Sequence, residues 1–259
     1  MTDLIFSSNP IVMQIALFLI LLLSIEVPYY WGRGNERLAE IDKGNWNTIQ
    51  AGIITLAAFM LGLTFAQAQD RFDARRGLVV REANAIGTTW LRADQLAPSE
   101  MMRFRQILRA YTRERLKGYS TPGDSDTHRR VISDSDRQQA QMWTIASTAL
   151  RSRPDDLGRS LLMTTLNDTI DLSSEQLNAL THHVPTAVIA LTILLAMFGA
   201  ISIGLQFARS KSRPILLTVL YAAAFAIVLN LIVDYDRPQV GLIHVSLDPI
   251  NIQLSAMER

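Results

Sequence analysis

The sequence contains no cysteine and carries almost no net charge. The absence of cysteine from all 259 residues excludes disulfides, thiol nucleophiles and cysteine-ligated zinc. The 25 basic and 24 acidic residues leave a formal net charge of +1. This balance gives no electrostatic basis for binding a polyanion. We therefore expect no nucleic-acid partner.

Charged residues are nearly missing from four long apolar windows, of which only the first contains one, Glu26. A helix needs about 20 residues to span a hydrocarbon core of roughly 30 Å. Core helices of a soluble protein are the alternative, but uncharged stretches of this length rarely recur in such folds. The sequence therefore predicts four transmembrane helices in a lipid bilayer, at about 11–27, 49–68, 184–207 and 214–233.

Residues that flank the windows indicate where the interfaces lie but leave the orientation open. Aromatic rings favour the membrane–water interface, and Tyr29, Tyr30, Trp31 and Trp46 stand at the ends of the first two windows. The loops after the first and third windows are basic, which by the positive-inside rule predicts that both are cytoplasmic. The segment after the second window is equally basic, with Arg71, Arg75, Arg76 and Arg81.

Between the second and third windows the chain is polar, and apolar residues return at helical spacing. Phe72, Val79, Ala83, Ile86 and Trp90 form one stripe. No glycine or proline lies between positions 64 and 76. We therefore expect the second window and this stripe to belong to one continuous helix.

The rest of the polar region predicts three further helices. One begins with Ser99 as its N-cap and ends at Gly118, and a loop covers 119–127. The next helix covers 136–151 and buries four residues, Met142, Trp143, Ala146 and Leu150. The last follows Pro154 and leads to the third window.

The pattern contains no strand alternation, so we predict an all-α fold. Its four transmembrane helices have a helical bundle inserted between helices 2 and 3. The expected domains are 1–69 with transmembrane helices 1 and 2, 70–183 as a helical extramembrane domain, 184–233 with helices 3 and 4, and 234–259 as a C-terminal tail.

Catalytic patterns are missing from the sequence. It has no glycine-rich phosphate loop, HExxH motif or nucleophile elbow. His182 and His183 are adjacent and would point about 100° apart on a helix, unlike a metal-binding i, i+4 pair. We predict no catalytic residue, metal site or cofactor, and no enzymatic activity.

Polar residues inside the windows are the first functional candidates, because burying them in lipid is costly. Glu26 and Asn230 are the two that we select. The alternative for Glu26 is an interfacial position beside Tyr29 and Tyr30, with its carboxylate reaching water.

The second window carries a stripe of its own. Thr55, Phe59, Leu63, Gln67 and Arg71 follow one another at four-residue steps, so apolar side chains give way to polar and cationic ones. In a ring of subunits this stripe would line a pore with a hydrophobic constriction. Plain helix packing is the alternative.

The stretch from Leu63 to Gly87, LTFAQAQDRFDARRGLVVREANAIG, resembles the segment of bestrophin anion channels in which a pore helix ends in the pattern F-R-x-N-x-x-Y-x-R-W-W-E-x-R. It resembles still more a bacterial membrane-protein family with a bestrophin-like domain. That resemblance spans nearly the whole chain and rests on four elements: RFDARR from Arg71 to Arg76, EANAIG from Glu82 to Gly87, LRAD from Leu91 to Asp94, and DRPxxGLIxVS from Asp236 to Ser246.

The sequence also departs from the bestrophin pattern. With Phe72 opposite the tyrosine, Arg75 and Arg76 replace the paired tryptophans and Gln69 replaces the asparagine. Asp234 and Asp236 are too few to form a bestrophin-like calcium clasp.

The resemblance implies a homo-oligomer, a pentamer, whose second helices surround a path for chloride or other small anions. Thr55, Phe59 and Leu63 would form the neck of this pore and Gln67 would extend its lining. Arg71, Arg75 and Arg76 would supply the charge of the vestibule. Both termini and the central domain would lie in the cytoplasm, below the inner (plasma) membrane.

A second reading is a membrane-anchored sensor or scaffold whose helical domain binds a protein partner. The charged segment after the second window suits both hypotheses, because it would form intersubunit ion pairs in a channel or a solvated face in a scaffold. It contains Asp70, Arg71, Asp73, Arg75, Arg76, Arg81 and Glu82.

Overall fold

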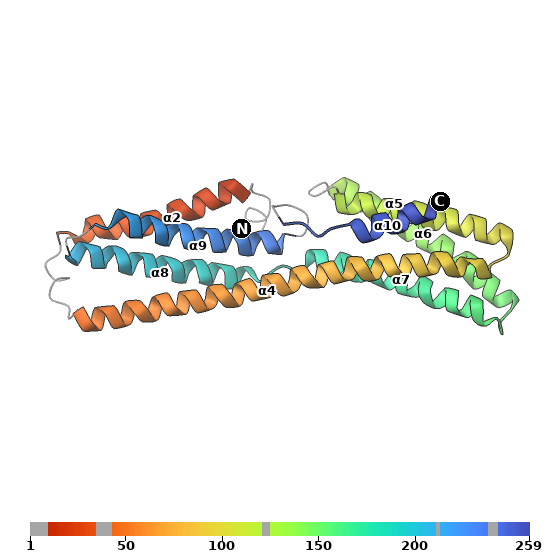
Figure 1. The fold of residues 1–259 in the computed structure, drawn as a ribbon, viewed down its shortest axis with the longest axis horizontal. Coiled ribbons are helices and arrows are strands. Elements are labelled where there is room, and N and C mark those ends of the chain that lie inside the picture. Colours follow the sequence, from red (N-terminus) through yellow and green to blue (C-terminus); the bar gives the residue numbers. More distant parts are fainter. Residues whose placement is uncertain (1–9, 35–42, 121–124, 211–212, 238–242) are drawn as a thin grey trace. The chain divides into compact units, whose positions relative to one another are not determined.

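The structure is a computed structural model that describes residues 10–34, 43–120, 125–210, 213–237 and 243–259 (Figure 1). In chain order its elements are α2 (Pro10–Gly32), α4 (Lys43–Arg92), the 3-10 helix η1 (Ala93–Gln95), α5 (Pro98–Ser120), α6 (Ser125–Ser152), α7 (Leu157–Thr181), α8 (Thr186–Ser210), α9 (Ile215–Asp236) and α10 (Asp248–Met257). No strand occurs among the described residues, which confirms the all-α class.

Among the described residues, four helices are long and apolar enough to cross a membrane. They are α2, the helical segment that begins at Gly44, α8 and α9. Each covers all or nearly all of one predicted window, since α8 begins two residues after the start of 184–207 and α9 one residue after the start of 214–233. The predicted number of spans is therefore confirmed.

The described residues form two compact units. The first contains α2, α4 up to Arg71, α8 and α9. The second contains α4 from Phe72 onward, η1, α5, α6, α7 and α10. Helix α4 is unbroken from Lys43 to Arg92, as the uninterrupted run between positions 64 and 76 predicted, and contributes residues to both units.

Small residues allow close packing in the first unit. Leu17 and Leu21 of α2 pack against Ala196 of α8 and against Ala222 and Ala226 of α9. A Cβ atom added at Gly204 of α8 would collide with the backbone carbonyl of Ile25 on α2. Small residues are typical of helix contacts in membranes, because they let two backbones approach each other.

The second unit is a helical bundle with a conventional apolar core. Phe104, Leu108 and Tyr111 of α5 pack against Met142 of α6 and Leu162 of α7. Helix α4 contributes Val79, Ala83 and Ile86, which are all buried as the predicted stripe requires.

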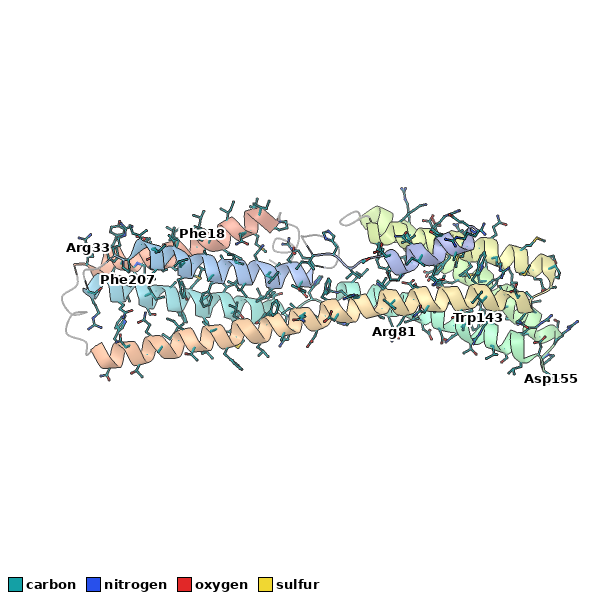
Figure 2. All side chains as sticks on the ribbon, in the orientation of Figure 1. Phe18, Arg33, Arg81, Trp143, Asp155 and Phe207 are labelled. Atoms are coloured by element: carbon teal, nitrogen blue, oxygen red, sulfur yellow. The ribbon has the colours of Figure 1, made fainter. Side chains whose placement is uncertain are left out.

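Several local predictions in the second unit were wrong. Helix α5 begins at Pro98, and Ser99 is not its N-cap. The Ala97 N–H instead donates to Glu100 Oε2 at 3.3 Å, so the carboxylate serves the first turn. Trp143, labelled in Figure 2, is 41% exposed, because Met142 and Ala146 already turn the neighbouring face of α6 inward.

The expected loop at 119–127 also differs. Tyr119 belongs to α5, and α6 begins at Ser125, well before the predicted position 136. Positions 121–124 lie outside the described residues. The predicted C-terminal tail contains a helix that we did not anticipate, α10, whose Ile250 and Met257 are buried in the second unit.

Candidate functional site

The predicted pore stripe lies on the face of α4 that the first unit leaves uncovered. Phe59 is 63% exposed, Leu63 is 42% exposed, Thr55 is exposed and Gln67 is half-buried. A helix turns about 100° per residue, so Ala68, nine residues after Phe59, lies half a turn away. Ala68 is fully buried in the unit's core. The chain therefore uses one side of α4 for its own packing and presents the side centred on Phe59 to its surroundings.

Small residues surround this stripe. A Cβ atom added at Gly52 or Gly62 would meet nothing within 4 Å, and Ala58 and Ala66 are exposed. On the opposite side, Thr64 Oγ1 lies 3.1 Å from Thr192 Oγ1 of α8, which ties the covered side of α4 to its neighbour. Phe59 is thus the one bulky aromatic side chain on a face of otherwise smaller residues.

The three arginines of the predicted vestibule do not share one environment. Arg76 is exposed and Arg71 is half-buried. Arg75 is only 2% exposed and donates from Nε to the Ala179 carbonyl at 3.1 Å and from Nη2 to the His182 carbonyl at 2.7 Å. Arg75 therefore satisfies backbone groups at the C-terminal end of α7, which differs from the solvent-facing position that we predicted for it.

Glu26 is paired at the end of α2. Its Oε2 lies 2.7 Å from Arg213 Nη2. The guanidinium of Arg213 also stands over the rings of Tyr29 and Tyr30, at 5.6 and 5.5 Å. This cluster of acid, base and aromatic rings has the composition of a membrane interface, as the alternative for Glu26 supposed.

Asn230 is buried in the first unit, and its Oδ1 has no hydrogen-bond partner among the described residues. Further along α9, Asp236 is fully buried and accepts the Val184 N–H with both carboxylate oxygens, at 3.0 and 2.9 Å. Asp234 accepts the Ile243 N–H at 3.0 Å. These two acids bind backbone amides, and the described residues contain no cluster of three potential metal ligands.

The polar site with the most hydrogen bonds surrounds Glu82, whose environment we predicted wrongly from the sequence. Glu82, expected to be solvated or paired between subunits, is fully buried inside the second unit. Arg115 Nε donates to its Oε1 at 2.6 Å, and the Tyr119 hydroxyl donates to its Oε2 at 2.9 Å. The Tyr111 hydroxyl lies 3.5 Å from the same Oε1. The available signal was helical spacing, because Glu82 stands three residues after Val79 and four before Ile86 on the buried stripe.

Burial and charge shift the ionisation of this network. Burial raises the pKa of Tyr111 to about 12 from its ordinary value of 10.0, and it raises the pKa of Tyr119 as well. For Arg115, burial disfavours the cation, but the Glu82 carboxylate together with Tyr111 and Tyr119 outweighs burial and raises the pKa of the guanidinium. The network therefore holds one ion pair and two neutral hydroxyls around neutral pH.

The fold and the apolar helices define an α-helical integral membrane protein. A family model described as the bestrophin-like domain matches residues 44–250. The chain therefore belongs to the bestrophin-like family, which confirms the resemblance seen in the sequence.

Solved structures show the same fold. A bacterial bestrophin homologue from Klebsiella pneumoniae superposes with a TM-score of 0.63 at 17% identity, over 96% of each chain. A single-residue variant of that homologue gives a TM-score of 0.66 at 18% identity, over 97% of each chain. Among curated proteins, none matches this sequence.

Proposed function

We propose that the chain is one subunit of an oligomeric anion channel of bestrophin type, in which copies of α4 surround the conduction path. The uncovered face of α4 supports this proposal most directly. Lipid can cover the apolar part of this face, but Thr55, which is exposed, and Gln67, which is half-buried, are polar. Polar side chains within a membrane span usually face a bundle interior or a water-filled path and not lipid. Phe59 at the centre of that side would form the constriction, with Thr55 and Leu63 one turn away on either side.

Anion preference would come from outside the span. Neither α4 between 49 and 68 nor α8 between 186 and 207 contains a basic residue. Arg71 and Arg76 supply positive charge further along α4. At the constriction, the positive edges of aromatic rings and the ends of helices would attract an anion more weakly. A hydrophobic constriction gates by dewetting, so its width controls passage more than its charge does.

The proposal extends to assembly and orientation. We propose a pentamer in the inner membrane, with residues 70–183 as a cytoplasmic domain between the membrane-spanning segments 1–69 and 184–233. The family membership supports this arrangement, whereas the charges that flank the spans leave the orientation open by themselves.

A second candidate, the scaffold, has one observation in its favour. The helical bundle exposes apolar side chains that include Leu91, Met102 and Leu157, at 67%, 64% and 72%. Such residues suit a partner surface, although neighbouring subunits of an oligomer would cover them equally well. Stoichiometry in detergent discriminates, because a channel requires a closed ring and a monomeric scaffold does not.

Chloride flux in reconstituted liposomes tests the channel. Replacing Phe59 by Ala should widen the constriction and increase the initial flux. Leu220→Ala is the control, since it shortens a similarly exposed apolar side chain on α9, which is 54% exposed. No flux from wild-type protein, or equal flux from wild type and Phe59→Ala, would contradict the proposed constriction.

A further inference from the structure

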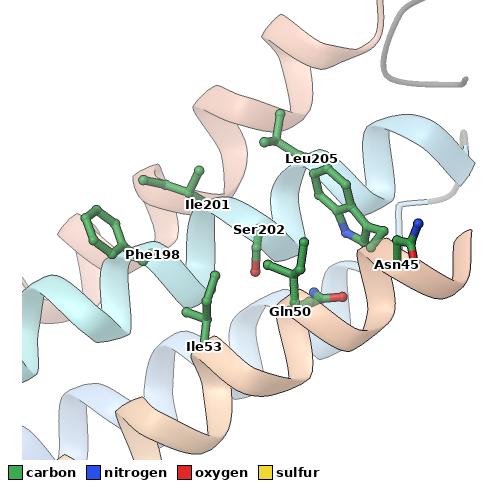
Figure 3. Close-up of a pocket in the computed structure, with 9 residues that line it drawn as sticks. Asn45, Gln50, Ile53, Phe198, Ile201, Ser202 and Leu205 are labelled. Atoms are coloured by element: carbon green, nitrogen blue, oxygen red, sulfur yellow. The ribbon is translucent and has the colours of Figure 1, made fainter. Parts of the chain in front are cut away.

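A groove of about 380 Å³ lies between α4 and α8 within the first unit (Figure 3). Side chains of the two helices face each other across it, with Gln50 and Ile53 on α4 and Phe198, Ile201 and Leu205 on α8. Both helices are membrane spans. The groove is therefore a mostly apolar depression in a part of the chain that the bilayer surrounds.

One polar side chain inside the groove lacks a partner. Gln50 is only 8% exposed, yet none of the described residues forms a hydrogen bond with its amide. The amide lines the groove, and the hydrocarbon region of a bilayer offers no water to bond it, so a hydrogen-bond partner from outside this chain would stabilise it. The groove is where such a partner would enter.

The end of the groove nearest the start of α4 is built differently. Trp46 lines it, and the indole Nε1 is buried without a partner among the described residues. The Arg209 guanidinium stands 5.3 Å from the centre of the Trp46 ring. Moving outward along the groove, the chain thus presents apolar walls, then an amide donor, then an indole N–H, then a cation.

We propose that this groove binds one acyl chain of a membrane phospholipid with an anionic headgroup. The order of groups in such a lipid matches the order of groups in the groove. The hydrocarbon would contact Ile53, Phe198 and Ile201, an ester carbonyl would accept from Gln50, and the phosphate region would lie near Trp46 and Arg209.

A helix from a second copy of the chain fits the groove less well. A helix with its side chains is about 10–12 Å across, so a second copy would place side chains and not its backbone in a groove of about 380 Å³. The backbone groups of a helix are already bonded to one another, so only a suitably placed polar side chain of a second copy could pair with the Gln50 amide or the Trp46 N–H. Ester and phosphate oxygens are free to accept from both.

Native mass spectrometry of the delipidated full-length protein tests the proposal. The probes are palmitoyl-oleoyl phosphatidylglycerol and the matching phosphatidylcholine. Wild type should bind phosphatidylglycerol about fivefold more tightly, the factor expected from the attraction of one basic side chain for an anionic lipid. Arg209→Gln should remove this preference and leave binding of phosphatidylcholine unchanged.

A groove-filling variant tests where the lipid binds. Ile201→Trp should reduce the retention of both lipids several-fold, because the indole occupies the space of the acyl chain. Leu216→Trp, at a position 70% exposed on α9 and outside the groove, is the matched control and should retain both lipids. Circular dichroism and the melting temperature of each variant confirm that it is folded.

Two results would overturn the proposal. One is a folded Ile201→Trp variant that retains both lipids like wild type, which would place the lipids elsewhere. The other is an Ile201→Trp variant that changes the number of subunits in the oligomer but retains lipids like wild type. That result would assign the groove to a contact between copies of the chain. Neither result depends on whether the protein conducts anions, so the lipid site and the channel proposal can fail separately.

Discussion

Arg115 on α5 and Glu82 on α4 form an ion pair of 2.6 Å that is almost completely removed from solvent, with side chains 5% and 0% exposed. Tyr119 completes the set of donors around the carboxylate. A buried charge is tolerated when it is paired and hydrogen-bonded, and it becomes costly when its partner is lost. The pair therefore determines which faces of α4 and α5 meet within the second unit.

Breaking this pair should destabilise the bundle strongly. Glu82→Gln or Arg115→Met alone should cost about 3–5 kcal/mol, because each leaves an unpaired buried charge or donor group. The double variant Glu82→Leu/Arg115→Met should recover much of that loss. Thermal unfolding in detergent measures the effect. Arg81→Gln is the control, because the Arg81–Glu175 pair at 3.4 Å is exposed on both sides and should contribute about 0–1 kcal/mol. Equal losses for Glu82→Gln and Arg81→Gln would contradict the assignment.

Alkaline pH should weaken the same unit through Tyr111. Its pKa is raised to about 12 by burial, whereas an unfolded tyrosine ionises near 10.0. The stability that comes from the neutral hydroxyl is therefore fully present below pH 10 and is lost as the pH rises through 12. Melting temperatures recorded between pH 8 and pH 12 should fall less steeply for Tyr111→Phe than for wild type. Parallel curves would show that this hydroxyl does not set the alkaline limit.

Arg75 should act on the last turn of α7 and not on ion passage. Its guanidinium holds the carbonyls of Ala179 and His182, and removing a partner from a buried carbonyl costs about 1–3 kcal/mol. Arg75→Gln should therefore speed hydrogen exchange at the end of α7 and lower the melting temperature. Arg76→Gln, one residue along and exposed, should leave both unchanged. A loss of anion selectivity in Arg75→Gln with normal exchange in α7 would restore the vestibule assignment.

Gly204 should tolerate no side chain, because of its contact with Ile25. A methyl group there meets the backbone of α2, which cannot move aside as a flexible side chain would. Gly204→Ala should cost about 1–3 kcal/mol by overpacking. Gly52→Ala, in the span of α4 with open space around it, should be neutral or slightly stabilising because alanine favours the helix. The native chain has no cysteine. One cysteine introduced on α2 and one on α8 can therefore be cross-linked, and the yield of that disulfide measures how close the two helices are. Unchanged cross-linking and stability in Gly204→Ala would argue against close approach.

Much of the architecture could be predicted from pattern alone. Hydrophobic length was enough to locate four spans, because the preference of a segment for lipid depends on its own length and composition and not on the segments that pack against it. The unbroken helix α4 was predictable for a similar reason, because nothing between positions 64 and 76 interrupts helical geometry. Helix limits were less predictable, as Tyr119 shows, because Pro122 and Gly123 made their whole neighbourhood resemble a loop.

The candidate sites depended more on packing. The spacing that puts Phe59 on one stripe with Thr55 and Leu63 was visible in the sequence, but its exposure was decided by packing and its role in a constriction stays a prediction. Arg75 and Glu82 were assigned to solvent because charged residues are usually found there. Only the positions of the α7 carbonyls and of Arg115 made their burial possible, and those partners lie far away in the chain.

By itself, the sequence determined the number of membrane spans, the helical class, the continuity of α4 and the family. These properties depend on local composition and spacing, which act within one segment. The tertiary structure decided which charges are buried, which face of α4 stays uncovered and where an apolar groove opens between α4 and α8. Those outcomes depend on interactions between residues that are far apart in the sequence, and these interactions form only when the helices pack against one another.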